Sequence, residues 1–132
     1  DKLRSSGLRP TKQRVKIAEF LFEREKTFHF TVEELDKLIN LKTSVQKISL
    51  ATFYNTVHAF KKAGHLKEIL TSNNKCYFDT HTGPHHHFFD LGNSKLTDID
   101  SEEIRIKNFP NAPKGKSIKD IDIVINIEND YH

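Results

Sequence analysis

One run, residues 49–64, constrains the fold of this chain more than any other. At about 100° per residue its large apolar side chains fall on one side of a helix, and they are Leu50, Phe53, Val57 and Phe60. Ser49 can accept a hydrogen bond from a first-turn amide, and Gly64 can supply the left-handed residue that ends a helix. The outer face is small, polar and basic, which suits a surface that meets DNA. It consists of Ala51, Thr52, Asn55, His58 and Lys62.

Two further helices are expected before this one. Apolar residues recur at helical spacing over residues 11–24, after Pro10, and the stripe consists of Val15, Ile17, Ala18, Leu21 and Phe22. A second helix begins at Thr31, where residues 31–34 have the form of a capping box, and its buried stripe is Val32, Leu35, Leu38 and Ile39. Extended runs at 65–70 and 75–79, separated by the turn-forming residues 71–74, predict a hairpin. Three helices and a hairpin predict a winged helix-turn-helix module.

The charges divide the chain. Residues 1–80 hold 15 Lys and Arg against 9 Asp and Glu, whereas residues 81–132 hold 6 against 9. A basic half suits a polyanion, because Lys and Arg at phosphates release condensed counterions. Turn residues at 81–84 stand where the balance changes sign. We therefore expect a DNA-binding domain over residues 1–80 and a second domain over residues 81–132.

The second domain is expected to be a sheet that needs a partner. Strands are predicted at 85–91, 95–99 and 118–128, with a loop at 108–115. The last strand alternates, with Ile121, Ile123, Ile125 and Ile127 on one face. Fifty-two residues bury little core alone, so this face is expected to meet a second copy and form a homodimer.

Cysteine use and hydropathy limit the remaining classes. Cys76 stands alone, which excludes an internal disulfide and a cysteine-built zinc site. No apolar run approaches the roughly 18 residues of a membrane span, and residues 1–7 carry no signal-peptide core. We expect a soluble, cytoplasmic protein without a membrane partner.

Histidines gather at the start of the second domain. His81, His85, His86 and His87 are half of the chain's eight. On a strand, His85 and His87 share one face and His86 points to the other. Neutral imidazole binds iron, zinc, copper or haem iron, so the triplet predicts ligation, the alternative being a solvated strand start. His29 and Asp79 gain weight as ligands only if the fold brings them beside His86.

Three motifs in order resemble one family over nearly the whole chain. Residues 8–14 resemble its helix entry, residues 49–56 its recognition helix, and the histidine triplet its metal-binding hinge. The chain resembles the ferric-uptake-regulator family of bacterial metal-responsive repressors. Asn55, residues 85–89 and the proline-containing tail are most similar to the alphaproteobacterial iron-response-regulator branch, which is associated with haem-dependent control of iron and haem metabolism genes.

The resemblance implies an α+β fold, a winged-helix domain followed by a small αβ dimerisation domain. It implies a divalent metal (iron, manganese or zinc) at a hinge site of His29, Asp79 and His86, where a further family histidine is replaced by Phe88. A second site would use His85 and His87 with a carboxylate at Glu102 or Glu103 and Asp120. Haem binding in the branch is linked to His85, His86 and His87. Residues 90–93 stand where many members carry cysteine pairs, so no cysteine-bound structural zinc is expected.

Recognition of an AT-rich inverted repeat would use the outer helix face. Tyr54 could place its ring against a thymine methyl, with Thr52 and Asn55 near base edges or phosphates. The phosphate contacts would be Lys12, Arg14 and Lys62, although a solvated residue is the alternative at each position. No metalloprotease, hydrolase or phosphate-loop motif is present, which argues against an enzyme. A metal or haem carrier without sequence-specific DNA binding is the other alternative.

Overall fold

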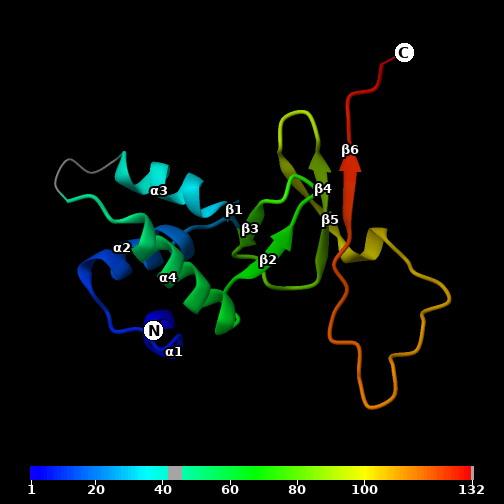
Figure 1. The fold of residues 1–132 in the computed structure, drawn as a ribbon, viewed down its shortest axis with the longest axis horizontal. Coiled ribbons are helices and arrows are strands. Elements are labelled where there is room, and N and C mark those ends of the chain that lie inside the picture. Colours follow the sequence, from blue (N-terminus) through cyan, green and yellow to red (C-terminus); the bar gives the residue numbers. More distant parts are fainter. Residues whose placement is uncertain (42–45, 132) are drawn as a thin grey trace. The chain divides into compact units, whose positions relative to one another are not determined.

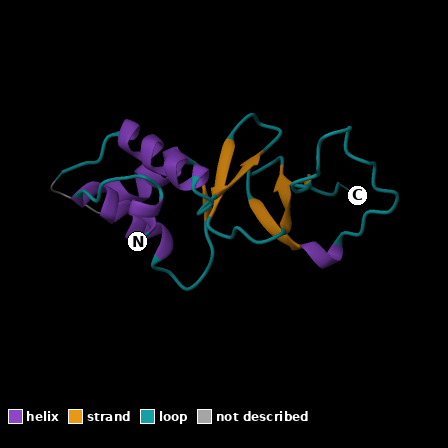
Figure 2. Ribbon diagram, turned by 90° about the horizontal axis from the view of Figure 1, so that it is seen from below, coloured by secondary structure: helices purple, strands orange, loops and turns teal. Residues whose placement is uncertain are grey.

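The computed structural model describes residues 1–41 and 46–131, and the chain separates into two compact units, Asp1–Thr82 and Gly83–His132. Figure 1 labels the elements and Figure 2 separates helices from strands by colour. Unit 1 holds α1 (Lys2–Ser5), α2 (Lys12–Phe22), β1 (His29–Phe30), α3 (Val32–Asn40), α4 (Leu50–Lys62), β2 (Lys67–Leu70) and β3 (Cys76–Asp79). Unit 2 holds β4 (His85–Asp90), β5 (Leu96–Asp100), the 3-10 turn η1 (Ser101–Glu103) and β6 (Val124–Ile127).

The helix starts follow local chemistry. The hydroxyls of Thr11, Thr31 and Ser49 each accept a hydrogen bond from the backbone N–H three residues on, which satisfies one orphan donor of α2, α3 and α4. Gly64 ends the last of these with a φ of +87°, a conformation that glycine adopts without strain. The predicted caps at Thr31, Ser49 and Gly64 are thus confirmed.

The core of unit 1 is built around α4. Phe53, Val57 and Phe60 are fully buried, as predicted. Leu50 is not: it is 43% exposed, because it is the first residue of the helix and the buried stripe runs through Thr56 instead. The Thr56 hydroxyl donates to the carbonyl of Thr52 at 2.7 Å, so this polar side chain is satisfied without water.

The buried stripes predicted for α2 and α3 are present, with one residue exposed that was predicted to be buried. Ile17 and Leu21 of α2 are fully buried, and Val15, Ala18 and Phe22 pack at the margin of the same core. In α3, Val32, Leu35 and Ile39 are buried, but Leu38 is 38% exposed. Leu38 lies about 100° around the helix from Ile39, at the edge of the stripe, which explains its exposure.

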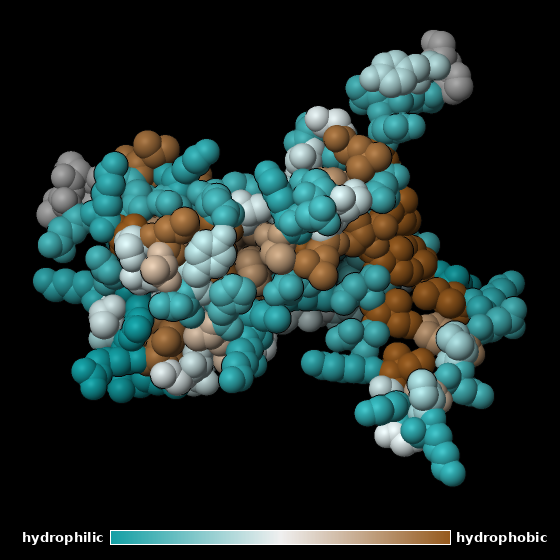
Figure 3. All heavy atoms as spheres, in the orientation of Figure 1, coloured by the Kyte–Doolittle hydropathy of each residue, from teal (hydrophilic) through white to brown (hydrophobic). Residues whose placement is uncertain are grey.

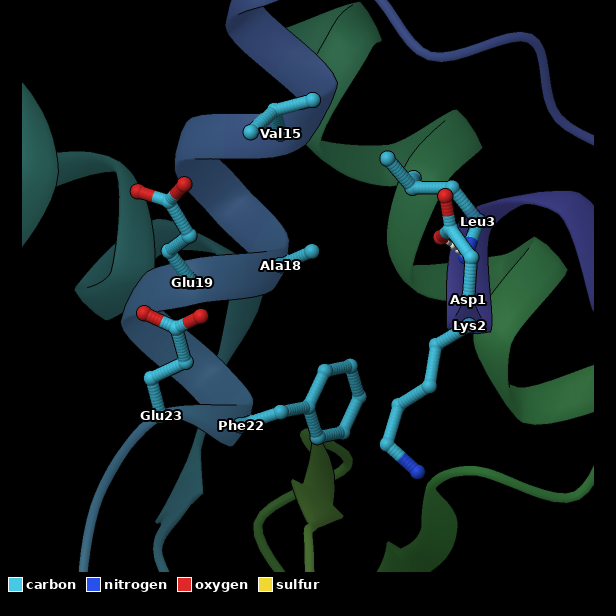
Figure 4. A pocket seen from close by; sticks show the side chains of 8 residues that line it. All are labelled: Asp1, Lys2, Leu3, Val15, Ala18, Glu19, Phe22 and Glu23. Carbon is cyan, nitrogen blue, oxygen red and sulfur yellow. Dashed lines mark hydrogen bonds between the residues drawn. The ribbon is translucent and has the colours of Figure 1, made fainter.

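Two short elements of unit 1 are absent from the sequence prediction. α1 buries Leu3, and Figure 4 shows its Lys2 reaching toward α2, where the ammonium lies 5.0 Å from the centre of the Phe22 ring. The two-residue strand β1 pairs with β3, giving a sheet of order β1-β3-β2 with the predicted hairpin as its other two strands. Phe28 and Thr80 extend the pairing, because each donates its N–H to the other residue, at 2.9 and 3.0 Å.

Unit 2 is a three-stranded sheet with β4 in the centre. β4 pairs antiparallel with β5 and parallel with β6. The strand predicted at 118–128 is shorter in the structure and begins at Val124, because the parallel ladder starts only where His87 faces Val124. Residues 108–115 form a loop, as predicted.

Unit 2 leaves a large apolar area exposed. Figure 3 shows hydrophobic residues gathered around β6 and the loop that precedes it. The exposed large apolar side chains of this unit include Leu91, Ile106, Phe109, Ile118, Ile125 and Ile127. Within the described parts of the chain, the structure has no helix long and apolar enough to cross a membrane.

Candidate metal centre and nucleic-acid interface

The strands β4 and β5 bring three metal-ligand side chains together. His87 and Asp98 are register partners, and His85 lies two residues before His87 on the same face. The Asp98 Oδ1 atom lies 3.3 Å from the Nε2 atom of His87 and 3.8 Å from that of His85. The imidazole rings are 4.5 Å apart between centroids and both are 2% exposed, whereas the side chain of Asp98 is 42% exposed. The cluster thus has a buried imidazole side and a carboxylate open to solvent.

A backbone contact orients the first of these rings. The Nδ1 atom of His85 lies 2.8 Å from the carbonyl oxygen of Gly83, which can only accept, so Nδ1 carries the proton. In the neutral ring the lone pair of Nε2 then lies on the side of Asp98, whose carboxylate can also only accept. Two acceptors that face each other favour a cation bound between them. Metal-bound histidines usually have the same support, the distal N–H bonded to a carbonyl.

Asp98 is the candidate ligand that sequence reasoning missed. Sequence reasoning placed the carboxylates at Glu102 or Glu103 and Asp120, but these are exposed and lie outside the cluster of donor atoms found among the described residues. The missing signal was register across the turn at residues 91–94. Pairing the predicted strands outward from that turn sets position 98 opposite position 87.

His86 occupies the other face of β4, as predicted, but its ring serves the backbone. Its Nδ1 atom accepts a hydrogen bond from the N–H of Ile123 at 3.1 Å, just before β6 begins. The side chain is 9% exposed. His86 therefore holds the start of β6 and stands apart from the cluster of His85 and His87.

His29 and Asp79 are brought together within unit 1. They are register partners at the end of the β1–β3 pairing. Asp79 is 1% exposed, and its Oδ1 atom accepts a hydrogen bond from the N–H of His81 at 2.9 Å. Register partners of an antiparallel pair carry their side chains on the same face, so this histidine and this carboxylate are a candidate donor pair, supplied by unit 1 alone.

The outer face of α4 is open, as predicted for a DNA-reading helix. Ala51, Asn55, His58 and Lys62 are exposed, and Lys12 is exposed at the start of α2. Thr52 is half-buried, its hydroxyl 2.9 Å from that of Ser49. Arg14 donates to the carbonyl of Arg9 at 3.0 Å. The described surface thus offers each of these side chains to solvent at least in part.

The hydroxyl of Tyr54 is held by a hydrogen bond within unit 1. Its hydroxyl donates to a carboxylate oxygen of Glu33 in the first turn of α3, an interaction that sequence reasoning missed. The shared hydrogen bond lowers the pKa of Glu33 and raises the pKa of Tyr54. No pattern in the sequence signals this pair, because the two residues are 21 positions apart on different helices.

Comparisons with known proteins agree with this architecture. The model of the ferric uptake regulator family matches residues 5–126. The peroxide-responsive repressor PerR of Staphylococcus epidermidis is 32% identical over 97 residues, 74% of this chain and 62% of that protein. PerR of Staphylococcus aureus strain Mu50 is also 32% identical, over 74% of this chain and 63% of that protein. The chain thus spans just under two thirds of the length of these relatives.

Solved structures share the fold. The ferric uptake regulator of Pseudomonas aeruginosa, solved with manganese, has a TM-score of 0.68 at 24% identity and covers 98% of this chain and 96% of its own. That of Francisella tularensis, solved with iron, has a TM-score of 0.69 at 16% identity, covering 93% and 92%. The α+β fold class predicted from the sequence is confirmed. The chain belongs to the ferric uptake regulator family, whose members are transcription regulators and not enzymes.

Proposed function

We propose that this chain is a metal-responsive transcriptional repressor that binds DNA through unit 1 and metal through the side chains of His85, His87 and Asp98. The observation that carries the proposal is this three-donor cluster, because two imidazoles and a carboxylate suit a divalent ion such as iron, manganese or zinc. The names of the relatives support it: a peroxide-responsive repressor, and ferric uptake regulators solved with manganese or iron.

A bound divalent ion would supply positive charge and a fixed arrangement of the ring nitrogens. The chain's own contribution is orientation: Gly83 holds the ring of His85, and β-sheet pairing sets Asp98 opposite His87. We assign His29 and Asp79 to metal binding as a donor pair of unit 1. We rank four other predicted ligands below these, because one bonds to the backbone and the other three are exposed. They are His86, which bonds to the backbone, and Glu102, Glu103 and Asp120.

Isothermal titration with Mn²⁺ tests these assignments on the full chain. Asp98→Asn removes the anionic donor with little change of shape, and we expect the affinity to fall at least roughly 10-fold, the loss that even outer-shell ligand changes cause. Asp100→Asn is the matched control, because Asp100 is exposed on the same strand and pairs with His85. Unchanged affinity in Asp98→Asn would overturn the assignment of the cluster.

The same titration examines the unit 1 pair. Asp79→Asn should weaken Mn²⁺ binding as well. A lower affinity with the stoichiometry kept at one ion per chain assigns both donor sets to one ion. Loss of one of two binding steps assigns them to two ions. No change in either quantity removes His29 and Asp79 from the proposal.

DNA binding is assigned to the outer face of α4 and the basic residues beside it. The contacts we propose are Lys12, Arg14, Ala51, Thr52, Tyr54, Asn55, His58 and Lys62. A second copy would cover the apolar surface around Ile125 and Ile127, and two reading helices related by a two-fold axis would suit an AT-rich inverted repeat. Such a regulator works on chromosomal DNA, so we place it in the cytoplasm.

Fluorescence anisotropy on an AT-rich inverted-repeat duplex tests DNA binding. We expect binding that prefers this duplex to a scrambled one and weakens steeply with salt. Lys62→Ala should weaken binding to both duplexes and lower the salt slope by about one. Weak binding that does not depend on salt would favour the alternative, a metal or haem carrier without sequence-specific DNA binding.

A finer proposal places the chain in the iron-response branch, with haem on the triplet. Residues 85–89 and the absence of cysteines at 90–93 support it. Because His85, His86 and His87 are at most 9% exposed, haem would reach them only after the groups that cover the two faces of β4 have moved. Binding that manganese preserves and haem abolishes would support this branch, whereas binding that requires manganese and ignores haem would refute it. His86→Ala should remove the haem response and leave the protein folded.

A further inference from the structure

The hydroxyl of Tyr54 is already engaged before any DNA is present. It donates to the carboxylate of Glu33, which joins the reading helix α4 to the first turn of α3. A hydrogen bond to an ionised carboxylate is among the stronger kinds that a neutral donor makes. The phenol end of Tyr54 therefore has a defined position in the free protein.

The ring of Tyr54 is supported on its face as well. The imidazole of His58, one turn along α4, stacks on it with centroids 6.0 Å apart and planes 16° from parallel. That imidazole in turn meets the buried ring of Phe78 on β3 edge-on, at 5.8 Å and 89°. Three elements, α3, α4 and β3, thus hold one aromatic side chain, and its remaining freedom to rotate is small.

Glu33 is a carboxylate within a surface assigned to DNA. It lies in the first turn of α3, where the positive end of the helix favours an anion. The charge of Lys75, from the turn between β2 and β3, also attracts it. Glu33, Tyr54, His58 and Lys75 are among the residues that line a cleft of about 490 Å³ in unit 1. A duplex that approaches the Tyr54 ring therefore meets the charge of Glu33.

We propose that Glu33 is a specificity-determining residue: it positions the Tyr54 ring for base contact, and its charge opposes every duplex, so that only a duplex that makes this contact binds tightly. The inference rests on the proposed function, because it assumes that Tyr54 reads DNA. It adds that the ring is the part that reads, since the hydroxyl is bonded to Glu33. Preorganisation lowers the entropy lost on binding the correct duplex, and repulsion weakens the wrong one.

The test uses the full chain, metal-loaded, and two duplexes of equal length and composition. One is the duplex of highest affinity recovered from a randomised pool by the wild-type chain, and the other is its scrambled version. Affinities are measured by anisotropy at low and at high salt. For Glu33→Ala we expect binding to the selected duplex to weaken about 10-fold, in line with the loss of a charged hydrogen bond. Binding to the scrambled duplex should become about two- to five-fold tighter at low salt and unchanged at high salt, because the repulsion is screened.

Conservative variants separate position from charge. Glu33→Gln keeps an acceptor for the Tyr54 hydroxyl but removes the charge, so it should bind both duplexes more tightly at low salt, with a ratio of selected to scrambled affinity close to that of the wild type. Tyr54→Phe should weaken binding to the selected duplex and leave binding to the scrambled duplex unchanged. The double variant Glu33→Ala with Tyr54→Phe should lose little more on the selected duplex than either change, because both break one hydrogen bond.

Glu34→Gln is the matched control, because Glu34 is an exposed carboxylate in the same helical turn that contacts Thr31 and not Tyr54. It should leave the affinity for the selected duplex unchanged. An unchanged ratio of selected to scrambled affinity in Glu33→Ala, or losses that multiply in the double variant, would overturn the inference. A wild-type chain that yields no preferred duplex would instead overturn the proposed function.

Discussion

Asn40 connects the end of α3 to Ile48, the residue before the N-cap of α4. Its amide N–H donates to the carbonyl of Ile48 at 2.9 Å, and its carbonyl accepts from the N–H of Ile48 at 2.8 Å. It also donates to the carboxylate of Asp36 at 2.5 Å. Because Ile48 directly precedes the N-cap Ser49, this pair of bonds sets where α4 begins. We predict that Asn40→Ala destabilises unit 1.

The size of the loss follows from these contacts. A typical intramolecular hydrogen bond contributes about 1 kcal/mol net, and an unpaired buried backbone group costs about 1–3 kcal/mol. The two bonds to the backbone of Ile48 are lost, and Ile48 is only 4% exposed, so water replaces them poorly. We therefore expect the free energy of unfolding to fall by about 2–3 kcal/mol. For a unit of this size that corresponds to a fall in Tm of roughly 10–20 °C.

Urea unfolding followed by circular dichroism measures the change, with the m-value checked for two-state behaviour. Lys37→Ala is the control, since Lys37 is an exposed residue of the same helix, and it should change the free energy of unfolding by no more than about 0.5 kcal/mol. Asn40→Asp keeps the acceptor but loses the donor and adds a charge beside Asp36, so it should be about as unstable as Asn40→Ala. A loss below about 0.5 kcal/mol in both Asn40 variants would refute the reasoning.

Three further predictions concern pH, assembly and the core. The pKa of Glu33 is lowered, so its bond to Tyr54 stabilises the fold above the ordinary value of 4.5; the pKa of Tyr54 is raised, so the bond stabilises the fold below 10. The contribution of this bond should therefore be full between about pH 5 and 9 and should fall outside that range. The melting temperatures of wild type and Glu33→Ala should differ most within the same range. Ile125→Asp places a charge on the exposed apolar strand β6 and should shift a dimer to monomer in sedimentation velocity, whereas a dimer that persists would place the interface elsewhere. Phe60→Ala removes a fully buried ring and should cost about 3–5 kcal/mol in urea unfolding; a cost under 1 kcal/mol would mean that the site collapses without a cavity.

Local chemistry made much of unit 1 readable from the sequence. A cap depends on residues within three or four positions of each other, so Thr31, Ser49 and Gly64 could be identified without knowing the fold. Burial at the margins could not. Leu38 and Leu50 have the right type and nearly the right spacing, yet they are exposed, because Leu38 lies at the edge of its stripe and Leu50 is the first residue of its helix. The strand β1, two residues long, has no periodicity to detect.

The candidate site shows the same limit. Histidine clustering and the alternation of strand faces separated His85 and His87 from His86 correctly. Asp98 lies eleven residues beyond His87 in the sequence, and only the register of β4 against β5 sets the two opposite each other. The bond between Glu33 and Tyr54 depends on how α3 and α4 cross, and no spacing in the chain encodes that crossing.

In the strand order β5-β4-β6, two of the proposed ligands lie on the central strand and the third lies on an edge strand, which is held less firmly. His85 and His87 lie on the central strand, whose backbone is bonded on both edges, so its amides should exchange with solvent most slowly in unit 2. Asp98 lies on β5, an edge strand, with its side chain open to water. Opening of the edge strand removes one ligand while both imidazoles stay in place. Metal exchange should therefore follow the opening rate of β5, and a substitution that stiffens this edge should slow the release of metal without changing the donor set.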